Sequence, residues 1–243
     1  MEFSRPVVLV HGAWHGAWCW ASFQAERDRR GIASYAIDLP GHGRSLEFYK
    51  NYTLTDLVLI IEQILKIEKI DRVHIIGHSM GGYLGAAFAK ERPQLTISLT
   101  MLNSIAGKDP KQRKLLRDRS IQLIEKHQEA YVNMAIANLF TTKEKDVFKS
   151  RIKKMKHQAH HISIKSIVQA LVCMRDRESS LETLKKLKLP ISYIYGLKDQ
   201  IILPNQVIPE CDFLEIDQKN MDSGHMSLLT NVADILKNMR FIE

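Results

Sequence analysis

Ser79 lies in the segment GHSMG at residues 77–81, where the residue types suit nucleophilic chemistry. A serine hydroxyl attacks a carbonyl carbon weakly unless the backbone exposes it and a base removes its proton. Glycines two positions before and two positions after the serine permit the sharp strand-to-helix turn that exposes the hydroxyl. An apolar run at 73–76 precedes this segment and an alanine-rich helical pattern follows it at 83–90. The sequence therefore predicts Ser79 as the nucleophile of a covalent mechanism.

A serine nucleophile on a strand-to-helix turn requires an acid and a histidine that follow it in that order along the chain. His225 follows a glycine just before the last helical pattern and is the predicted base. Asp199 comes directly after the apolar run 191–195 and is the predicted acid. Asp222 is a rival for the role of acid, although its place on the same short loop as His225 is more typical of a turn or capping residue.

The oxyanion that forms on attack needs hydrogen-bond donors, and the loss of one donor costs about 3 kcal/mol of transition-state stabilisation. The backbone N–H of Met80, next to the nucleophile, is the first predicted donor. The loop HGAW at residues 11–14 follows the first apolar run, and its glycine lets the backbone approach Ser79. The N–H of Ala13 is therefore the second predicted donor. We expect His11 to brace this loop by hydrogen bonding rather than to transfer protons.

The elements that must position these residues form a regular pattern. Short apolar runs alternate with amphipathic stretches before residue 108 and after residue 188, which is typical of βα units and a parallel sheet. Runs that are apolar on both faces indicate strands that helices cover on both sides. Ligands of such sheets bind beyond the carboxyl ends of the strands, where the candidate residues lie. The predicted strands are 7–10, 34–37, 73–76, 97–102, 191–195 and 213–216, and the predicted helices are 18–30, 54–67, 83–90 and 226–239.

Residues 108–188 have a helical period, long charged stretches and no strand pattern. We therefore predict a helical cap at 108–188, inserted into an α/β core formed by 1–107 and 189–243. Several apolar residues are predicted to shape an acyl pocket, although packing against the sheet is the alternative for each cap position. These predicted substrate-binding residues are Trp14, Ile167, Leu171 and Met174.

The net charge of +8 is concentrated in the predicted cap. Residues 108–188 hold 20 of the 35 lysines and arginines but 9 of the 27 aspartates and glutamates. An anionic acyl carrier is a candidate partner for such a surface, and a solvated helix face is the simpler explanation. No nucleic-acid-binding signature accompanies the charge, so we expect no nucleic-acid partner.

The composition of the 243 residues, 45% hydrophobic and 26% charged, is typical of a globular protein. No apolar stretch approaches the roughly 20 residues that cross a bilayer. Residues 1–6 lack an export pattern, so we expect a cytoplasmic protein without a membrane span. Cys19, Cys173 and Cys211 are far apart and show no C-x-x-C spacing, which predicts reduced, buried thiols without a disulfide framework or a zinc site.

Five motifs in order resemble those of the α/β-hydrolase superfamily of serine hydrolases. They are HG at 11–12, DLPGHGRS at 38–45, GHSMGG at 77–82, Gly196 with Asp199, and GH at 224–225. The resemblance implies the α/β-hydrolase fold, a Ser79-His225-Asp199 triad, and oxyanion donors at Ala13 and Met80. Because the chain begins almost at the strand that the family counts third, the resemblance further implies a sheet of six strands, all parallel.

Smaller segments are similar to particular branches of that superfamily. The loop at 11–20 is similar to plant methylesterases and hydroxynitrile lyases, whereas residues 38–45 and 173–177 resemble bacterial hydrolases of small esters. The lyases carry a threonine and a lysine where this chain has Gly12 and Met226, which speaks against lyase chemistry.

The predicted function is hydrolysis of a small carboxylic ester or thioester through an acyl-enzyme, without a metal or an organic cofactor. One alternative is a hydrolase of substrates linked to coenzyme A or acyl carrier protein, which the basic cap would attract. Another is a ligand receptor that retains the triad but turns over slowly. The intact set of nucleophile, base, acid and donor loops favours catalysis.

Overall fold

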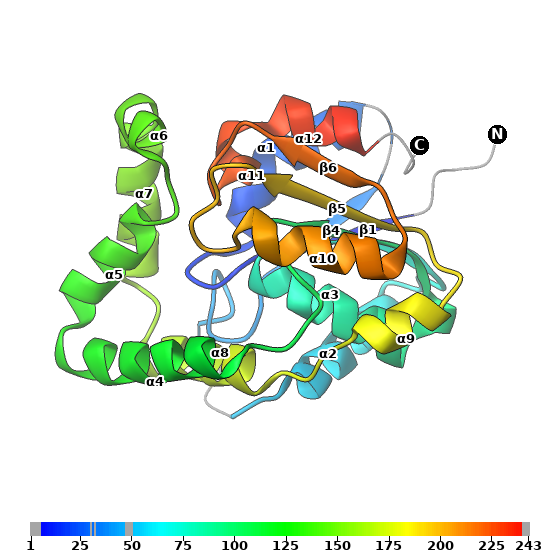
Figure 1. The fold of residues 1–243 in the computed structure, drawn as a ribbon, viewed down its shortest axis with the longest axis horizontal. Coiled ribbons are helices and arrows are strands. Elements are labelled where there is room, and N and C mark those ends of the chain that lie inside the picture. The colour runs from blue at the N-terminus through cyan, green and yellow to red at the C-terminus, as the bar shows by residue number, and fades with distance from the viewer. Residues whose placement is uncertain (1–5, 30, 32, 47–50, 240–243) are drawn as a thin grey trace.

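The computed structural model describes residues 6–29, 31, 33–46 and 51–239 and contains a six-stranded sheet in which every neighbouring pair is parallel (Figure 1). This confirms the predicted six-stranded parallel sheet and the α/β-hydrolase fold. The order across the sheet is β2-β1-β3-β4-β5-β6. The strands are β1 Val7–Val10, β2 Ser34–Ile37, β3 Val73–His78, β4 Thr96–Leu102, β5 Ile191–Gly196 and β6 Gln218–Met221.

Helices cover both faces of the sheet, which explains why its central strands are apolar throughout (Figure 1). Val7 and Leu9 of β1 share a cluster with the short helix η1 and with α1, α11 and α12, whereas Val8 and Val10 point into the opposite cluster with α2, α3 and α10. The helices are η1 Ala17–Trp20, α1 Ala21–Arg29, α2 Leu54–Ile67, α3 Met80–Glu91, α10 Pro204–Leu214, α11 Ser227–Thr230 and α12 Val232–Asn238, with the short η2 at Pro93–Leu95.

The predicted strand at 213–216 is wrong. Phe213 and Leu214 form the end of α10, and Glu215 ends that helix in a left-handed conformation with φ 59°. The sixth strand follows at Gln218–Met221, where three of four residues are polar and largely solvent-accessible. An edge strand has fewer covering neighbours, so its side chains need not be apolar. The apolar pair belonged to the buried face of a helix instead.

Two predicted helices are broken in the structure. The stretch 18–30 divides into η1 and α1, with Arg30 outside the described residues, and the stretch 226–239 divides into α11 and α12 around Asn231. The predicted helix at 54–67 is confirmed as α2 with the same bounds, and Thr53 and Asp56 form a reciprocal capping box at its start.

Six helices and no strand occupy the described part of the predicted cap. Helix α4 packs on α5 and α8, α5 packs on α7, and α5 to α7 stand beside the sheet in Figure 1. The last helix, α9, packs on α3 and α10 instead. The domain boundaries at 108 and 188 stay a prediction. The six helices are α4 Lys111–Lys126, α5 Gln128–Ala137, α6 Thr142–Val147, α7 Lys149–Ala159, α8 Ile164–Asp176 and α9 Leu181–Lys186.

Among the described residues, no helix combines the length and the apolar character that a bilayer crossing requires. Cys19, Cys173 and Cys211 are buried free thiols, as their spacing predicts.

The turn between β3 and α3 is tight enough to require its glycines. A Cβ on Gly77 would collide with the backbone of Gly81, and a Cβ on Gly81 would collide with the carbonyl of Val10 in β1. Neither obstacle is a side chain that can turn away. The two glycines therefore allow the backbones of β1, β3 and α3 to approach one another closely next to Ser79.

Substituting Gly77→Ala is expected to destabilise the protein by about 3 kcal/mol, because the added methyl group must displace backbone. Urea unfolding followed by circular dichroism measures this change. Gly31→Ala is the matched control, since Gly31 has φ +71° but open space around it and is expected to cost about 1 kcal/mol. If the two variants lost the same free energy of unfolding, the predicted steric clash at Gly77 would be wrong.

Candidate active site

Three residues with strained backbones lie at the carboxyl ends of neighbouring strands. Trp14, Ser79 and Asn103 have φ of 71°, 53° and 46°, and they follow β1, β3 and β4. Positive φ is costly for residues other than glycine, and such strain is concentrated at functional sites. The sheet edge where the sequence places the chemistry is therefore also where the backbone is strained.

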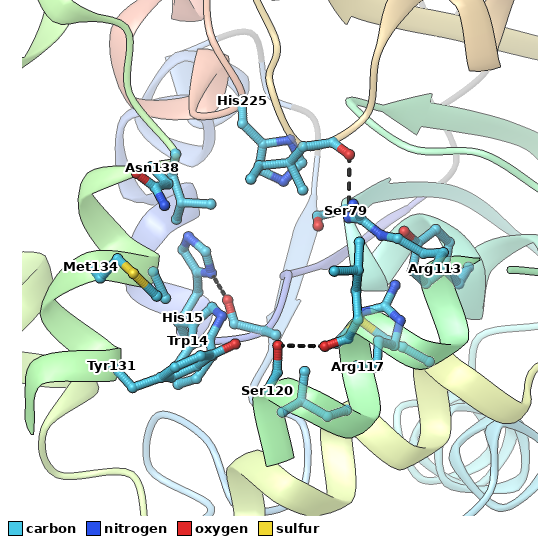
Figure 2. A pocket seen from close by; sticks show the side chains of 18 residues that line it. Trp14, His15, Ser79, Arg113, Arg117, Ser120, Tyr131, Met134, Asn138 and His225 are labelled. Atoms are coloured by element: carbon cyan, nitrogen blue, oxygen red, sulfur yellow. Dashed lines mark hydrogen bonds between the residues drawn. The ribbon is translucent and has the colours of Figure 1, made fainter. Parts of the chain in front are cut away.

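Backbone contacts on two sides hold Ser79 in this conformation. Its N–H donates to the carbonyl of Leu102 at 3.0 Å, and its own carbonyl accepts from the hydroxyl of Ser104 at 2.7 Å. Helix α3 begins at the next residue, Met80, so Ser79 lies at the positive end of the helix dipole. The side chain of Ser79 lines a cavity (Figure 2).

His225 and Asp199 meet although 26 positions separate them in the chain. The Nδ1–H of His225 donates to Oδ2 of Asp199 at 2.8 Å, and both side chains are buried. The other oxygen, Oδ1, accepts the N–H groups of Ile201 and Ile202 at 2.8 and 2.9 Å, and Nδ2 of Asn103 donates to Oδ2 at 2.9 Å. Burial by itself raises the pKa of the Asp199 carboxyl, but the attraction of His225 and these hydrogen bonds hold the pKa below its ordinary value.

Asp222, the rival acid, lies elsewhere. Its carboxylate is exposed and pairs with Nζ of Lys198 at 2.6 Å. Asn103 acts as a support for Asp199, and its own Oδ1 accepts the hydroxyl proton of Ser227.

The cavity has a volume of about 210 Å³ and brings together most of the predicted residues. Ile167 does not line it, because this side chain is turned into the core and is 2% exposed. At Ile167 the alternative prediction therefore holds, and the side chain serves packing in the core. The predicted residues that do line the cavity are Ala13, Trp14, Ser79, Leu171, Met174 and His225.

Helices α4 and α5 with the two residues after α5 supply half of the residues that line the cavity, and the sequence analysis did not predict them. The signal was present, because Arg113, Arg117 and Ser120 recur at helical spacing on one face of α4. These side chains surround the same cavity as Ser79 and His225 in Figure 2. The residues from this region are Arg113, Leu116, Arg117, Ser120, Tyr131, Met134, Ala135, Asn138 and Leu139.

Ala13 lines the same cavity as Ser79, whereas Met80, the residue after Ser79, is fully buried and does not line it, and their roles as oxyanion donors stay a prediction. Within the described residues, the N–H groups of Ala13 and Met80 have no protein acceptor. A Cβ on Gly12 would lie 3.0 Å from Cβ of Ser79, so the glycine lets the Ala13 loop approach the nucleophile.

His11 braces this loop, as expected. Its Nε2 accepts the N–H of Leu39 at 3.0 Å, which leaves Nδ1–H to donate to the carbonyl of Gly12 at 2.7 Å. Burial and the neighbouring His42 lower the pKa of His11 to about 3, so the ring is neutral. A neutral ring with both nitrogens bonded suits a brace rather than a proton carrier.

Two contacts from distant parts of the chain hold the His225 loop. Nε2–H of His78 donates to the carbonyl of His225 at 2.9 Å. On the other side, Oε1 of Glu144, a buried residue of α6, accepts the N–H of Gly224 at 2.9 Å. Oε2 of Glu144 accepts the N–H of Thr141 and so caps α6. The histidine loop is thus tied to the helical segment that covers the cavity, through a contact that no local pattern reveals.

A family model described as the alpha/beta hydrolase family matches residues 7–190. This span covers most of the chain and includes the serine turn. The chain belongs to the alpha/beta hydrolase family. Solved structures agree with this assignment of the fold. A thermophilic esterase from Thermogutta terrifontis has a TM-score of 0.88 at 20% identity, with 98% of this chain and 90% of that chain covered. The enol-lactonase from Burkholderia xenovorans has a TM-score of 0.89 at 18% identity, with 98% and 91% covered.

A relative with a curated name is similar over most of this alpha/beta hydrolase. A 2-hydroxy-6-oxononadienedioate/2-hydroxy-6-oxononatrienedioate hydrolase from Burkholderia vietnamiensis is 25% identical over 216 residues, which cover 82% of this chain and 72% of that protein. A protein of the same name from Cupriavidus pinatubonensis is 32% identical over 108 residues, which cover 43% of this chain and 37% of that protein. The family match and the names of these relatives make the chain a hydrolase, and the solved structures show its fold.

The Asp199→Asn variant is expected to lose about 2 kcal/mol of stability at pH 7, because hydrogen bonds to a charged group are lost. The pKa of Asp199 is depressed in the folded protein, so this stability is present above the ordinary value of 3.8 and lost as the pH falls through the folded-state pKa. Urea unfolding of both proteins between pH 7 and pH 3 should show the difference shrinking. The exposed Asp212→Asn serves as control, and a difference that is constant with pH would contradict the depressed pKa.

The Glu144→Ala variant is expected to lower kcat/KM about tenfold, because the buried N–H of Gly224 loses its acceptor next to His225. Glu144→Gln retains an acceptor oxygen and should recover most of the activity. Steady-state kinetics measure both, with the exposed Glu125→Ala of α4 as control. A loss in Glu144→Gln as large as that in Glu144→Ala would show that the charge, rather than the hydrogen bond, matters.

Proposed function

We propose that this hydrolase cleaves small carboxylic esters or thioesters through an acyl-enzyme formed on Ser79. The observation that carries the proposal is the shared cavity of Ser79 and His225, in which His225 donates to the buried Asp199. A strained nucleophile at a helix N-terminus, a histidine and an orienting carboxylate are the groups that acyl transfer requires.

In the proposed mechanism, the tautomer of His225 decides the direction of proton transfer. Because Nδ1–H donates to Asp199, the free Nε2 is available to take the proton of Ser79 as its oxygen attacks the carbonyl carbon. The N–H groups of Ala13 and Met80 stabilise the resulting oxyanion. His225 then gives the proton to the leaving alkoxide or thiolate, and Asp199 stabilises the imidazolium between these steps. A water molecule repeats the sequence and releases the acid.

The cavity supports a small substrate. Its volume of about 210 Å³ suits a compact molecule, and Trp14, Leu171 and Met174 offer apolar surface for a short acyl group. The related folds include proteins described as esterases and an enol-lactonase, and an enol-lactone is itself an internal ester.

The Ser79→Ala variant is expected to lose at least about 1,000-fold in kcat while remaining folded, because the nucleophile is gone. A chain-length series of p-nitrophenyl esters and acyl thioesters, including coenzyme A thioesters, measures the activity. A fluorophosphonate should add to one serine in the wild type, and mass spectrometry of the labelled peptide should place it on Ser79. Ser150→Ala, at an exposed site on α7, is the control.

Pre-steady-state kinetics separate an enzyme from a slow receptor. A receptor would release about one equivalent of p-nitrophenol and then stall, whereas the proposed hydrolase continues to turn over. If Ser79→Ala retained wild-type hydrolysis, the acyl-enzyme proposal would be rejected.

A further inference from the structure

The cavity beside Ser79 is lined by cationic side chains without a carboxylate. Among its described lining residues are Arg113 and Arg117, both from the same face of α4, and no aspartate or glutamate. Guanidinium groups stay charged at every physiological pH. A partly enclosed cavity with cations on its wall and no anion raises the local concentration of negatively charged ligands.

Arg117 already has a partner. Its guanidinium donates to Oδ2 of Asp109, while Arg177 lies 2.7 Å from Oδ1 of the same carboxylate. All three side chains are buried, and Arg177 also interacts with the buried Glu210. Arg177 also lies over the ring of Tyr83 at 3.8 Å from its centroid. Arg117 and Tyr83 line the cavity, whereas Asp109 and Arg177 do not, so Arg117 is a fixed and already partnered part of the wall.

Arg113 is different, because within the described residues no carboxylate lies within ion-pair distance of it. It is half-buried, and its Nη2 donates to the carbonyl of Ile201 at 3.2 Å. Ile201 lies two residues after Asp199, so this bond places the guanidinium beside the loop that carries the acid. A guanidinium has five N–H donors in a rigid plane, and one bond to a carbonyl leaves others for a ligand.

We propose that Arg113 binds a carboxylate of the substrate, so that the natural substrate is an ester or thioester carrying an ionised carboxyl group. This rests on the proposed function and names its substrate class. A carboxylate matches the planar fork of a guanidinium through two parallel hydrogen bonds. Within the described residues Arg113 has no carboxylate partner, so its planar fork is open to one bidentate carboxylate. Arg113 thereby selects and orients the substrate, while Ser79 and His225 perform the chemistry.

Two matched pairs of substrates test the proposal on either side of the scissile bond. On the acyl side, p-nitrophenyl hydrogen glutarate is compared with its neutral counterpart, in which an isopropyl group replaces the carboxylate. On the alcohol side, p-acetoxybenzoate is compared with p-isopropylphenyl acetate. The quantity measured is the ratio of kcat/KM for the charged ester to that for the neutral ester.

The wild type is expected to prefer the charged ester in one of the pairs, and Arg113→Met is expected to lower that ratio roughly 10- to 100-fold. Arg113→Lys keeps the charge without the planar fork and should retain part of the preference. Arg119→Met removes an exposed charge from the same helix and is the matched control for long-range electrostatics. Ratios in both pairs that are the same in the wild type and Arg113→Met would overturn the proposal.

A binding measurement distinguishes a failure of the Arg113 proposal from a failure of the proposed function. Titration calorimetry of glutarate and of p-hydroxybenzoate into Ser79→Ala tests the carboxylate site without turnover. The carboxylate site is supported, even if no ester is hydrolysed, when the double variant Ser79→Ala/Arg113→Met binds these ligands at least about tenfold more weakly than Ser79→Ala. Hydrolysis of neutral and charged esters with equal efficiency, together with binding that Arg113→Met does not weaken, would leave the proposed function standing and remove Arg113 from it.

Discussion

The close approach of the β3–α3 turn to the end of β1 is the constraint on which the rest of the site depends. Ser79 has a backbone conformation that costs free energy, and it persists because β3, α3, Leu102 and Ser104 hold it from several directions. Gly77 and Gly81 allow these backbones to meet. Once the turn is formed, Ser79 lines the same cavity as Ala13 and Trp14 of the loop after β1.

The histidine rings near His225 are buried, and burial sets their protonation state. The rings of His78 and His225 are 5.1 Å apart, and His15 and His78 are 5.7 Å apart. Burial, followed by repulsion from neighbouring imidazoles, lowers the pKa of His78 to about 3 and that of His15 well below its ordinary value. These rings therefore stay neutral at physiological pH. His225 differs from them in its partner, because its Nδ1–H donates to the carboxylate of Asp199.

The helical segment over the cavity contributes more than a cover. Helices α4 and α5 supply much of the wall, Glu144 of α6 holds the loop before His225, and Arg113 of α4 bonds to the loop after Asp199. The proposed carboxylate site at Arg113 and the contacts that hold the loops of Asp199 and His225 thus come from the same helical segment. A change in the packing of this segment would therefore alter both the cavity wall and the loops that carry Asp199 and His225.

The elements and the serine turn that were predicted from the sequence have local signals. Ser79 needs glycines at fixed short spacings, β1 and β3 need apolar residues on both faces, and α2 needs a capping box at Thr53, so each is written in a few consecutive residues. The choice of Asp199 over Asp222 also followed from a local pattern, since an acid directly after a buried strand lies at the edge where ligands bind.

Long-range contacts decided the remainder. The edge strand at Gln218–Met221 is polar because its place at the edge does not require apolar side chains, and the apolar residues before it pack inside a helix. Ile167 and Leu171 lie one turn apart on the same face of α8, so which of them lines the cavity depends on how far along α8 the cavity extends. The contact of Glu144 with Gly224 joins residues 80 positions apart. Such contacts leave no periodic trace in the sequence, because they arise from the packing of whole elements, and that packing is settled by the tertiary structure alone.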